Sequence, residues 1–248
     1  MIQTVVLITG ANRGIGKGLL TAYLGRPNTT VIAACRDASA EKTKGLRSLP
    51  RGVGSDLILV PISLDIPESA TNAVQQLQTQ HNIKHIDIVV ANAGICNHWS
   101  PLAEMEDSVL LAHLDVNTFG PLRLFRAAFS LLQASNQPKF VYISTSLASI
   151  AGLETSSSWT TAYGVSKVAG NYLVKKIDAE YGSLIAFSID PGFVQTDMGN
   201  RGARANGLEK APMTIHESVD GIVYQIETAT KATTSGRFLR HNGESVPW

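Results

Sequence analysis

Apolar runs of strand length alternate with segments of helical spacing along almost the whole chain, and this alternation restricts the fold more than any other feature. Runs rich in Val, Ile and Leu occupy residues 4–10, 30–35, 56–64, 86–94, 139–145 and 184–192, with a weaker run at 236–243. Helical spacing marks residues 17–25, 69–82, 108–133 and 162–182. Strands that are apolar on both faces and separated by helices are typical of parallel βαβ units. We therefore expect an α/β fold with a doubly wound parallel sheet of about seven strands and helices on both faces.

The length of the chain limits the number of domains, and its net charge argues against nucleic acid and anionic membranes as partners. The 248 residues suit one domain, 1–248, and the sequence contains no internal repeat or linker. A net charge of +1 gives no strong field for nucleic acid or an anionic membrane. Only two cysteines occur, no signal peptide precedes the first strand, and no run reaches the ~18 apolar residues of a membrane span. These observations lead us to expect a cytoplasmic protein.

A glycine-rich loop joins the first expected strand to the first expected helix. In "LITGANRGIGKGLL", Gly10, Gly14 and Gly16 stand between the two elements. Glycine permits a tight turn there and lets a pyrophosphate approach the backbone, while the helix N-terminus offers free N–H groups. Because strand, loop and helix occur in the required order, the segment predicts a nucleotide-binding Rossmann fold rather than an ordinary turn.

The end of the second expected strand distinguishes between the two nicotinamide dinucleotides. A carboxylate at this point would bind the ribose diol of NAD, but the strand ends in Cys35 followed by Arg36. A guanidinium matches a phosphate, and Arg13 in the glycine loop could reach the same group. This pattern favours NADP(H). In the alternative, Arg36 is merely solvated and Asp37 binds the diol.

A tyrosine and a lysine stand four residues apart in "AYGVSK", residues 162–167. Side chains at this spacing share one face of a helix, so Tyr163 and Lys167 are expected to lie side by side. Such pairs also occur on ordinary helix surfaces. Their meaning therefore depends on the motifs around them.

Taken together, the motifs resemble those of the short-chain dehydrogenase/reductase family. They are "TGANRGIG" at 9–16, "ANAG" at 91–94, "DVNTFG" at 115–120, the Tyr163–Lys167 pair and "PGFVQTDM" at 191–198. The segments 5–20, 26–37 and 235–248 further resemble the norsolorinic acid ketoreductase-like and C-factor-like branch of that family. The resemblance covers almost the whole chain.

The resemblance implies a catalytic set of Asn117, Thr145, Tyr163 and Lys167. Tyr163 would protonate a carbonyl oxygen, and Lys167 would lower the pKa of the phenol and bind the nicotinamide ribose. Asn117 would hold a water between Lys167 and solvent. The family's serine is replaced, since its motif reads "ISTSLAS" here and aligns the serine with Thr145. Ser146 is the alternative, and Ser144 is a weaker one because adjacent strand residues point to opposite faces.

The resemblance also implies a cofactor site for NADPH/NADP+ and no metal. Its expected residues are Gly10, Asn12, Arg13, Gly14, Ile15, Gly16, Arg36, Asp65, Ile66, Asn92, Ala93, Gly94, Tyr163, Lys167, Pro191, Gly192, Val194 and Thr196. Asp65 could also cap the following helix. Cys96, His98 and Trp99 are expected beside the substrate. The Gly-rich segment 199–210 is expected to be a mobile loop, and the region 197–215 is a candidate substrate lid.

Two functions follow from these motifs. The leading one is an NADPH-dependent carbonyl (keto) reductase that transfers hydride between NADP(H) and a small-molecule ketone or alcohol, in secondary metabolism. The alternative is a Rossmann-fold nucleotide-sensing or interaction protein without turnover. Retention of Asn117, Tyr163 and Lys167 together favours the enzyme. Relatives of this kind imply a homodimer or homotetramer, packed through the helices near 108–133 and 162–182.

Overall fold

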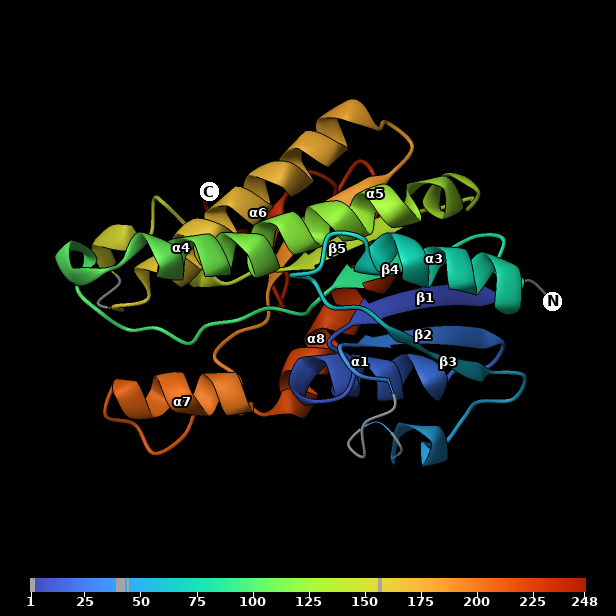
Figure 1. Ribbon diagram of the computed structural model, residues 1–248, viewed down its shortest axis with the longest axis horizontal. Coiled ribbons are helices and arrows are strands. Elements are labelled where there is room, and N and C mark those ends of the chain that lie inside the picture. The colour runs from blue at the N-terminus through green and yellow to red at the C-terminus, as the bar shows by residue number, and fades with distance from the viewer. Residues whose placement is uncertain (1–2, 39–42, 44, 156–157) are drawn as a thin grey trace.

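The computed structural model describes residues 3–38, 43, 45–155 and 158–248. Its centre is a parallel sheet of seven strands in the order β3-β2-β1-β4-β5-β6-β7 (Figure 1). The strands are β1 (Thr4–Thr9), β2 (Thr29–Cys35), β3 (Asp56–Pro61), β4 (Ile88–Ala91), β5 (Lys139–Ile143), β6 (Ile185–Asp190) and β7 (Phe238–Arg240). The sequence-based expectation of a single-domain, doubly wound Rossmann fold is confirmed.

The strand order reverses at β1, and this reversal determines where a ligand can bind. β1 pairs in parallel with β2 on one side and with β4 on the other, so that Leu7 stands opposite both Ile32 and Val89. The crossovers leaving the two sides run in opposite directions, which opens a crevice beyond the carboxyl ends of β1 and β4. The fold therefore places a binding site at that edge.

Helices cover both faces of the sheet (Figure 1). They are α1 (Gly14–Leu24), α3 (Ser69–Gln80), α4 (Asp107–Leu114), α5 (Gly120–Gln133), α6 (Thr161–Glu180), α7 (Asp197–Ala205) and α8 (Ile215–Thr228), with short 3₁₀ turns at Gly45–Ser48, Leu102–Glu104, Ser146–Ala148 and Leu153–Thr155. Helices α3, α5 and α6 lie on one face, while α1 and α8 pack together on the other. No helix among the described residues has the length and apolarity needed to cross a bilayer.

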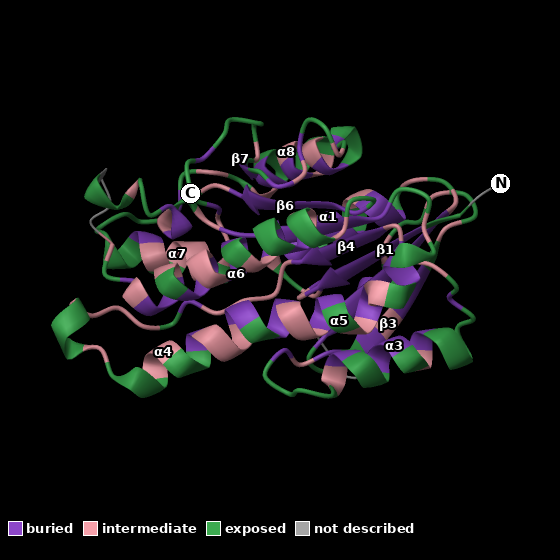
Figure 2. Ribbon diagram, turned by 90° about the horizontal axis from the view of Figure 1, so that it is seen from above, coloured by how far each residue is buried: buried purple, intermediate pink, exposed green. Residues whose placement is uncertain are grey.

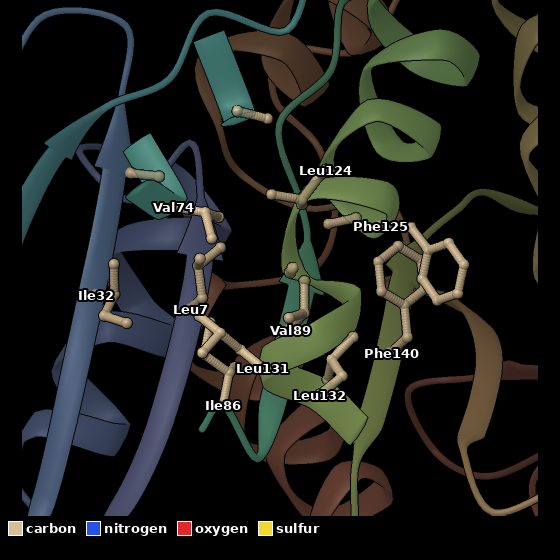
Figure 3. Packing of buried hydrophobic residues seen from close by; sticks show 14 of the residues in the cluster. Leu7, Ile32, Val74, Ile86, Val89, Leu124, Phe125, Leu131, Leu132 and Phe140 are labelled. Atoms are coloured by element: carbon tan, nitrogen blue, oxygen red, sulfur yellow. The ribbon is translucent and has the colours of Figure 1, made fainter. Parts of the chain in front are cut away.

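Two apolar cores follow from this layering. Successive residues of a strand point to opposite faces, so Leu7 joins the core under α3 and α5, while Val6 and Ile8 join the core under α1 and α8. Figure 3 shows the first core, to which Leu124 and Leu131 of α5 and Val89 of β4 all belong. The strands are buried almost throughout, whereas the helices bury one side and expose the other (Figure 2).

The structure corrects three element assignments. Residues 108–133 are not one regular helix, because a π-helical turn at Asp115–Phe119 separates α4 from α5. Part of the expected loop 199–210 is helical: the Thr196 hydroxyl accepts a hydrogen bond from Gly199 N at 3.0 Å and starts α7 despite its glycines. Helix α8 was not anticipated at all, although Thr214 and Glu217 form a capping box at its start.

Candidate active site

A cavity of about 1140 Å³ opens at the carboxyl ends of the central strands. This is larger than the pockets that typically hold one drug-sized ligand. It brings together nearly all the expected cofactor residues: Gly10, Asn12, Arg13, Gly14, Ile15, Gly16, Arg36, Asp65, Asn92, Ala93, Gly94, Pro191, Gly192, Val194 and Thr196. Thr145, Tyr163 and Lys167 line the same cavity. Ile66 does not contribute to this lining, and the residue is 53% exposed.

The glycine loop has the geometry of a phosphate cradle. Gly10 and Gly14 have φ angles of +66° and +52°, a region that side chains disfavour. A Cβ on Gly16 would overlap the carbonyl oxygen of Gly10, so the loop requires glycine there. Helix α1 begins at Gly14 with no side chain capping its N-terminus and no acidic residue in its first turn. Its free N–H groups therefore fit a dinucleotide diphosphate.

The expected 2′-phosphate site contains one free arginine and one paired arginine. Arg36 is exposed at the end of β2, and among the described residues it has no hydrogen-bond or ion-pair partner. Arg13 instead donates to the Asp197 carboxylate at 3.0 Å. Both side chains of that pair are more than half exposed, so the pair contributes at most about 1 kcal/mol. Arg13 could therefore exchange Asp197 for a phosphate at small cost.

Asp65 lies in the cavity wall rather than at a helix cap. Its carboxylate accepts a hydrogen bond from the Ser63 hydroxyl. Helix α3 begins at Ser69, and no side-chain bond caps its N-terminus. The capping alternative for Asp65 is therefore wrong in this structure, while its position matches the expected cofactor contact.

The ends of β1 and β4 are tied together beside the glycine loop. The Thr9 hydroxyl accepts hydrogen bonds from the backbone N–H groups of Asn92 at 3.0 Å and Ala93 at 3.1 Å. The Asn92 amide donates to the Thr9 carbonyl at 2.8 Å. A Cβ on Gly94 would come within 2.9 Å of the Asn117 amide oxygen, so glycine allows the chain to pass close to the catalytic residues.

Asn117 lies in the π-helical turn, where its side chain is buried behind the cavity and does not line it. An inserted residue re-aims side chains within a helix, and such turns are frequent at functional positions. The fully buried Asn117 donates to Ile95 O and to the Ser166 hydroxyl, both at 2.9 Å, and accepts from Ile95 N at 2.8 Å. Its own carbonyl accepts from the Tyr142 hydroxyl at 2.8 Å. Asn117 therefore fixes the chain after β4 against α6.

Tyr163 and Lys167 lie one turn apart on α6, as the sequence spacing predicts. Tyr163 is 9% exposed and Lys167 is 3% exposed. The ammonium nitrogen of Lys167 lies 5.8 Å from the centre of the Tyr163 ring and donates to Ile143 O at 2.7 Å. It also lies 4.5 Å above the ring of Tyr142, where a cation is favoured.

Burial controls the ionisation of this pair, and the expected effect on the phenol is not observed. Desolvation raises the pKa of Tyr163 well above its usual value, and Cys96 and Asp190 raise it further. A hydrogen bond with the Thr145 side chain acts in the opposite direction. Desolvation also lowers the pKa of Lys167 to about 7. The pKa of the phenol is therefore raised overall and not lowered as expected, because burial disfavours the charged form of both groups.

Of the three candidate hydroxyls, that of Thr145 faces Tyr163. Thr145 is half-buried at the start of a 3₁₀ turn, where its oxygen accepts from Leu147 N at 3.3 Å. Ser146 is exposed at the cavity edge. Ser144 is buried, and its hydroxyl has no hydrogen-bond partner in the described structure. The arrangement matches the assignment of Thr145 to the serine position of the motif.

The three side chains expected beside the substrate line two different cavities. Cys96 and Trp99 line the main cavity, but His98 contacts Ser100 at 2.9 Å and borders a smaller one. Sequence reasoning missed Asp190, a buried carboxyl in the cavity wall that directly precedes Pro191. An acid at the end of an otherwise apolar strand was the available signal. Within the described ranges, no three His, Cys, Asp or Glu side chains are grouped as metal ligands.

Comparisons with known proteins agree with this geometry. A family model described as short chain dehydrogenase matches residues 4–206. The chain is 44% identical over 250 residues to norsolorinic acid ketoreductase nor1 of Dothistroma septosporum, covering 99% of this chain and 93% of the relative. It is 45% identical over 249 residues to norsolorinic acid ketoreductase of Aspergillus parasiticus, covering 99% and 92%.

A solved structure extends the match to three dimensions. The NADPH-bound carbonyl reductase from chicken fatty liver superposes with a TM-score of 0.86 at 26% identity, over the full length of both chains. The cradle, the tyrosine–lysine pair and the π turn thus stand in a fold shared with that protein. By sequence and fold, the chain belongs to the short-chain dehydrogenase family, whose oxidoreductases act on carbonyl and alcohol groups.

Proposed function

We propose that this protein is an NADPH-dependent ketoreductase that reduces a small-molecule ketone to an alcohol. The observation that carries the proposal is that two hydroxyl groups and an ammonium group line the same cavity. Tyr163 and Thr145 face each other there, and Lys167 lies one helical turn from Tyr163. A protein that only sensed a nucleotide would have no use for two converging hydroxyls beyond the phosphate cradle.

The residues divide the reaction between them. Bound NADPH would supply the hydride that reaches the carbonyl carbon. Thr145 and Tyr163 hydrogen-bond the carbonyl oxygen, and Tyr163 transfers its proton to that oxygen as negative charge develops on it. Burial suits this direction, because it keeps Tyr163 in the neutral phenol form that can donate. Protonated Lys167 stabilises the phenolate that remains.

Preference for NADPH over NADH is supported by the two arginines. Among the residues that the structure describes, Arg36 beside the cavity has no partner and Arg13 has one exposed ion pair. Neither needs to break a strong interaction before it binds a 2′-phosphate. The chicken carbonyl reductase, which shares the fold, binds NADPH according to its description.

The substrate half of the cavity favours a flat apolar ketone. Trp99, Leu147, Phe193 and Met198 line it together with Cys96. Aromatic and apolar side chains bury planar rings effectively. The relatives named as norsolorinic acid ketoreductases extend the proposal to an aromatic ketone of secondary metabolism. Because Asn200 and Gly202 of α7 also line the cavity, the segment 197–215 is proposed as the lid over this substrate.

The assembly and location of the enzyme form the last part of the proposal. Leu111, Phe119, Val165 and Tyr172 are large apolar side chains exposed on α4, α6 and the turn between α4 and α5. A second copy of the chain packed there would cover them, which supports a homodimer or homotetramer built through these helices. We place this assembly in the cytoplasm.

A cofactor-oxidation assay tests the proposal. Purified enzyme is mixed with NADPH and a panel of aryl ketones, quinones and diketones, and loss of NADPH absorbance is followed. At least one aryl ketone should be turned over by wild type and not by Tyr163→Phe, whose fold is checked by circular dichroism. Binding of NADPH without turnover of any carbonyl would favour the nucleotide-sensing alternative. Comparison of Thr145→Val with Ser146→Ala assigns the second hydroxyl.

A further inference from the structure

A fully buried tyrosine, Tyr142, lies behind the active site, and the reaction described above assigns it no role. It belongs to β5 and has the parity of Phe140, so its side chain lies in the core under α5 and α6. It does not line the cavity itself. A buried tyrosine needs a hydrogen-bond partner for its hydroxyl. Two contacts, one of the ring and one of the hydroxyl, join Tyr142 to residues of the site.

The neighbours of Tyr142 leave room for its ring. In the sheet it stands opposite Ala91 of β4 and Ser188 of β6, which are both small residues. On the α6 side it meets Gly170, where a Cβ would overlap the Tyr142 hydroxyl and the adjoining end of the ring. Each of the three surrounding elements therefore contributes a small residue, and this position on β5 accommodates an aromatic side chain.

The face of this ring lies beside the Lys167 ammonium. The nitrogen is 4.5 Å from the centre of the Tyr142 ring, whereas the centre of the Tyr163 ring is 5.8 Å away. The same nitrogen donates to the carbonyl of Ile143, the next residue of β5, at 2.7 Å. An aromatic face attracts a cation, and the attraction is strongest where water is excluded. Two adjacent groups of β5, a ring and a carbonyl, thus favour a charge that burial disfavours.

The hydroxyl of Tyr142 connects the same side chain to the π-helical turn. It donates to the carbonyl of Asn117 at 2.8 Å, and burial raises the pKa of this phenol well above its usual value, so the proton is retained. The Asn117 amide donates to the Ser166 hydroxyl at 2.9 Å, which donates to the carbonyl of Tyr163 at 2.8 Å. Tyr142 therefore contacts both the turn that carries Asn117 and the ammonium of Lys167.

Three other ionisable groups belong to the surroundings of Lys167. Tyr163 precedes it by one turn of α6, Cys96 lies in the segment after β4, and Asp190 lines the same cavity from the end of β6. Burial raises the pKa of Cys96 to about 11 and that of Tyr163 well above its usual value, so both are neutral near pH 7. Substitution of Tyr142 leaves these three groups in place, so a change in the ionisation of Lys167 reports the ring.

We propose that Tyr142 is a positioning residue of this active site: the face of its ring holds the Lys167 ammonium in place and keeps it charged beside Tyr163. The proposal rests on the proposed ketoreductase function. A charged Lys167 stabilises the phenolate that remains after Tyr163 gives up its proton, so the ring extends the pH range of ketone reduction upward. The hydroxyl has a separate role, since it fixes the turn that carries Asn117.

The decisive comparison is between Tyr142→Leu, which removes the ring, and Tyr142→Phe, which keeps it. The kcat/KM of ketone reduction is measured against pH for both variants and wild type. Its fall with rising pH reports loss of the Lys167 charge. In Tyr142→Leu the fall should move to lower pH by about one unit, because a desolvated cation–π contact contributes about a tenfold change in an equilibrium. Tyr142→Phe should keep the wild-type position. An unmoved fall in Tyr142→Leu overturns the proposal.

Phe140→Leu is the matched control. Phe140 is a buried residue of the same strand and the same core, and its ring packs against that of Phe125 at 5.3 Å between centres. Its replacement removes a ring two residues before Tyr142, so thermal stability should decrease while the pH profile keeps its position. If Phe140→Leu moves the profile as far as Tyr142→Leu does, the effect is general loosening of the core and the proposal is overturned.

A fluorinated series tests the ring with little change in its shape. Phenylalanine, 4-fluorophenylalanine and 3,4,5-trifluorophenylalanine are placed in turn at position 142. Fluorine withdraws electron density from the ring face and so weakens its attraction for a cation. The fall of kcat/KM should move to lower pH as fluorine atoms are added. A constant position overturns the proposal, even where Tyr142→Leu does not fold.

A second readout does not require turnover. Protein labelled with ¹³C in its lysine side chains is titrated by NMR, and the Lys167 signal is identified by its loss in Lys167→Arg. The apparent pKa of Lys167 should be about one unit lower in Tyr142→Leu than in wild type, and equal values overturn the proposal. Failure of wild type to reduce any ketone refutes the proposed function, while this titration still tests Tyr142. Normal ketone reduction with an unmoved titration refutes only the role of Tyr142.

Discussion

Replacement of Arg36, at the end of β2, should weaken the binding of NADPH and leave the binding of NADH nearly unchanged. Arg36 has no partner within the described structure, so its contacts with a 2′-phosphate are made without breaking an existing bond. A charge-assisted hydrogen bond contributes about 1.5–3 kcal/mol, which corresponds to about a 10- to 150-fold change in affinity. Arg36→Ala should weaken NADPH by that factor and leave NADH within about twofold.

The other arginine should behave differently because it is already paired. Arg13→Ala loses a phosphate contact but also removes an ion pair with Asp197 that is worth at most about 1 kcal/mol. Its effect on NADPH binding should therefore be smaller than that of Arg36→Ala. Asp197→Asn releases Arg13 and should tighten NADPH binding by up to about fivefold.

Fluorescence titration of both cofactors gives the dissociation constants directly. Arg51→Ala is the matched control, since Arg51 is an exposed arginine that pairs with Asp56 at 2.8 Å and does not line the cavity. It should change neither constant. A parallel loss of NADPH and NADH binding in Arg36→Ala would show that Arg36 supports the fold or the adenine rather than the 2′-phosphate, and would refute this reasoning.

Three further predictions concern the catalytic end of the cavity. Thr145→Val should lower ketone turnover by about 10- to 100-fold while Thr145→Ser retains most of it, and equal rates in steady-state assays would remove Thr145 from the mechanism. Because the pKa of Lys167 is about 7, its positive charge is lost as pH rises through that value, and kcat/KM for ketone reduction should fall over the same range. In Lys167→Arg, whose guanidinium stays charged, this fall of kcat/KM near pH 7 should disappear. Gly94→Ala places a Cβ 2.9 Å from the Asn117 amide oxygen and should reduce kcat, whereas Gly182→Ala, which enters open space, should match wild type in kcat and in thermal unfolding.

The alternation of apolar runs with helical segments was sufficient to predict the architecture, and the motifs between them were sufficient to predict which residues line most of the cavity. Continuous apolar strands and their spacing predicted the parallel sheet, and the glycine loop predicted the cradle, because these features depend on local sequence. Helix α8 was missed because it follows a Gly-rich segment, although the capping box of Thr214 and Glu217 is a sequence signal of a helix start. The helical content of α7 was missed for a similar reason: one Thr196 hydroxyl begins a helix that propensity alone disfavours.

Ionisation could not be predicted from spacing. The four-residue interval places Lys167 beside Tyr163, and an adjacent cation normally lowers a phenol pKa. The outcome depends on burial and on the charges of Cys96 and Asp190, which lie far from Tyr163 in the sequence. Asp190 was overlooked for the same reason, since only the fold brings it into the cavity that Tyr163 also lines.

Proton donation by Tyr163 during ketone reduction is the centre of this account, and one variant tests it most directly. Turnover of a reactive aryl ketone is measured at saturating NADPH for wild type and Tyr163→Phe, with NADPH affinity measured alongside. The account predicts a fall in turnover of about 10²–10⁴-fold with cofactor affinity kept within about twofold, because the phenol acts only in proton transfer. A Tyr163→Phe enzyme that turns over at nearly the wild-type rate would contradict it.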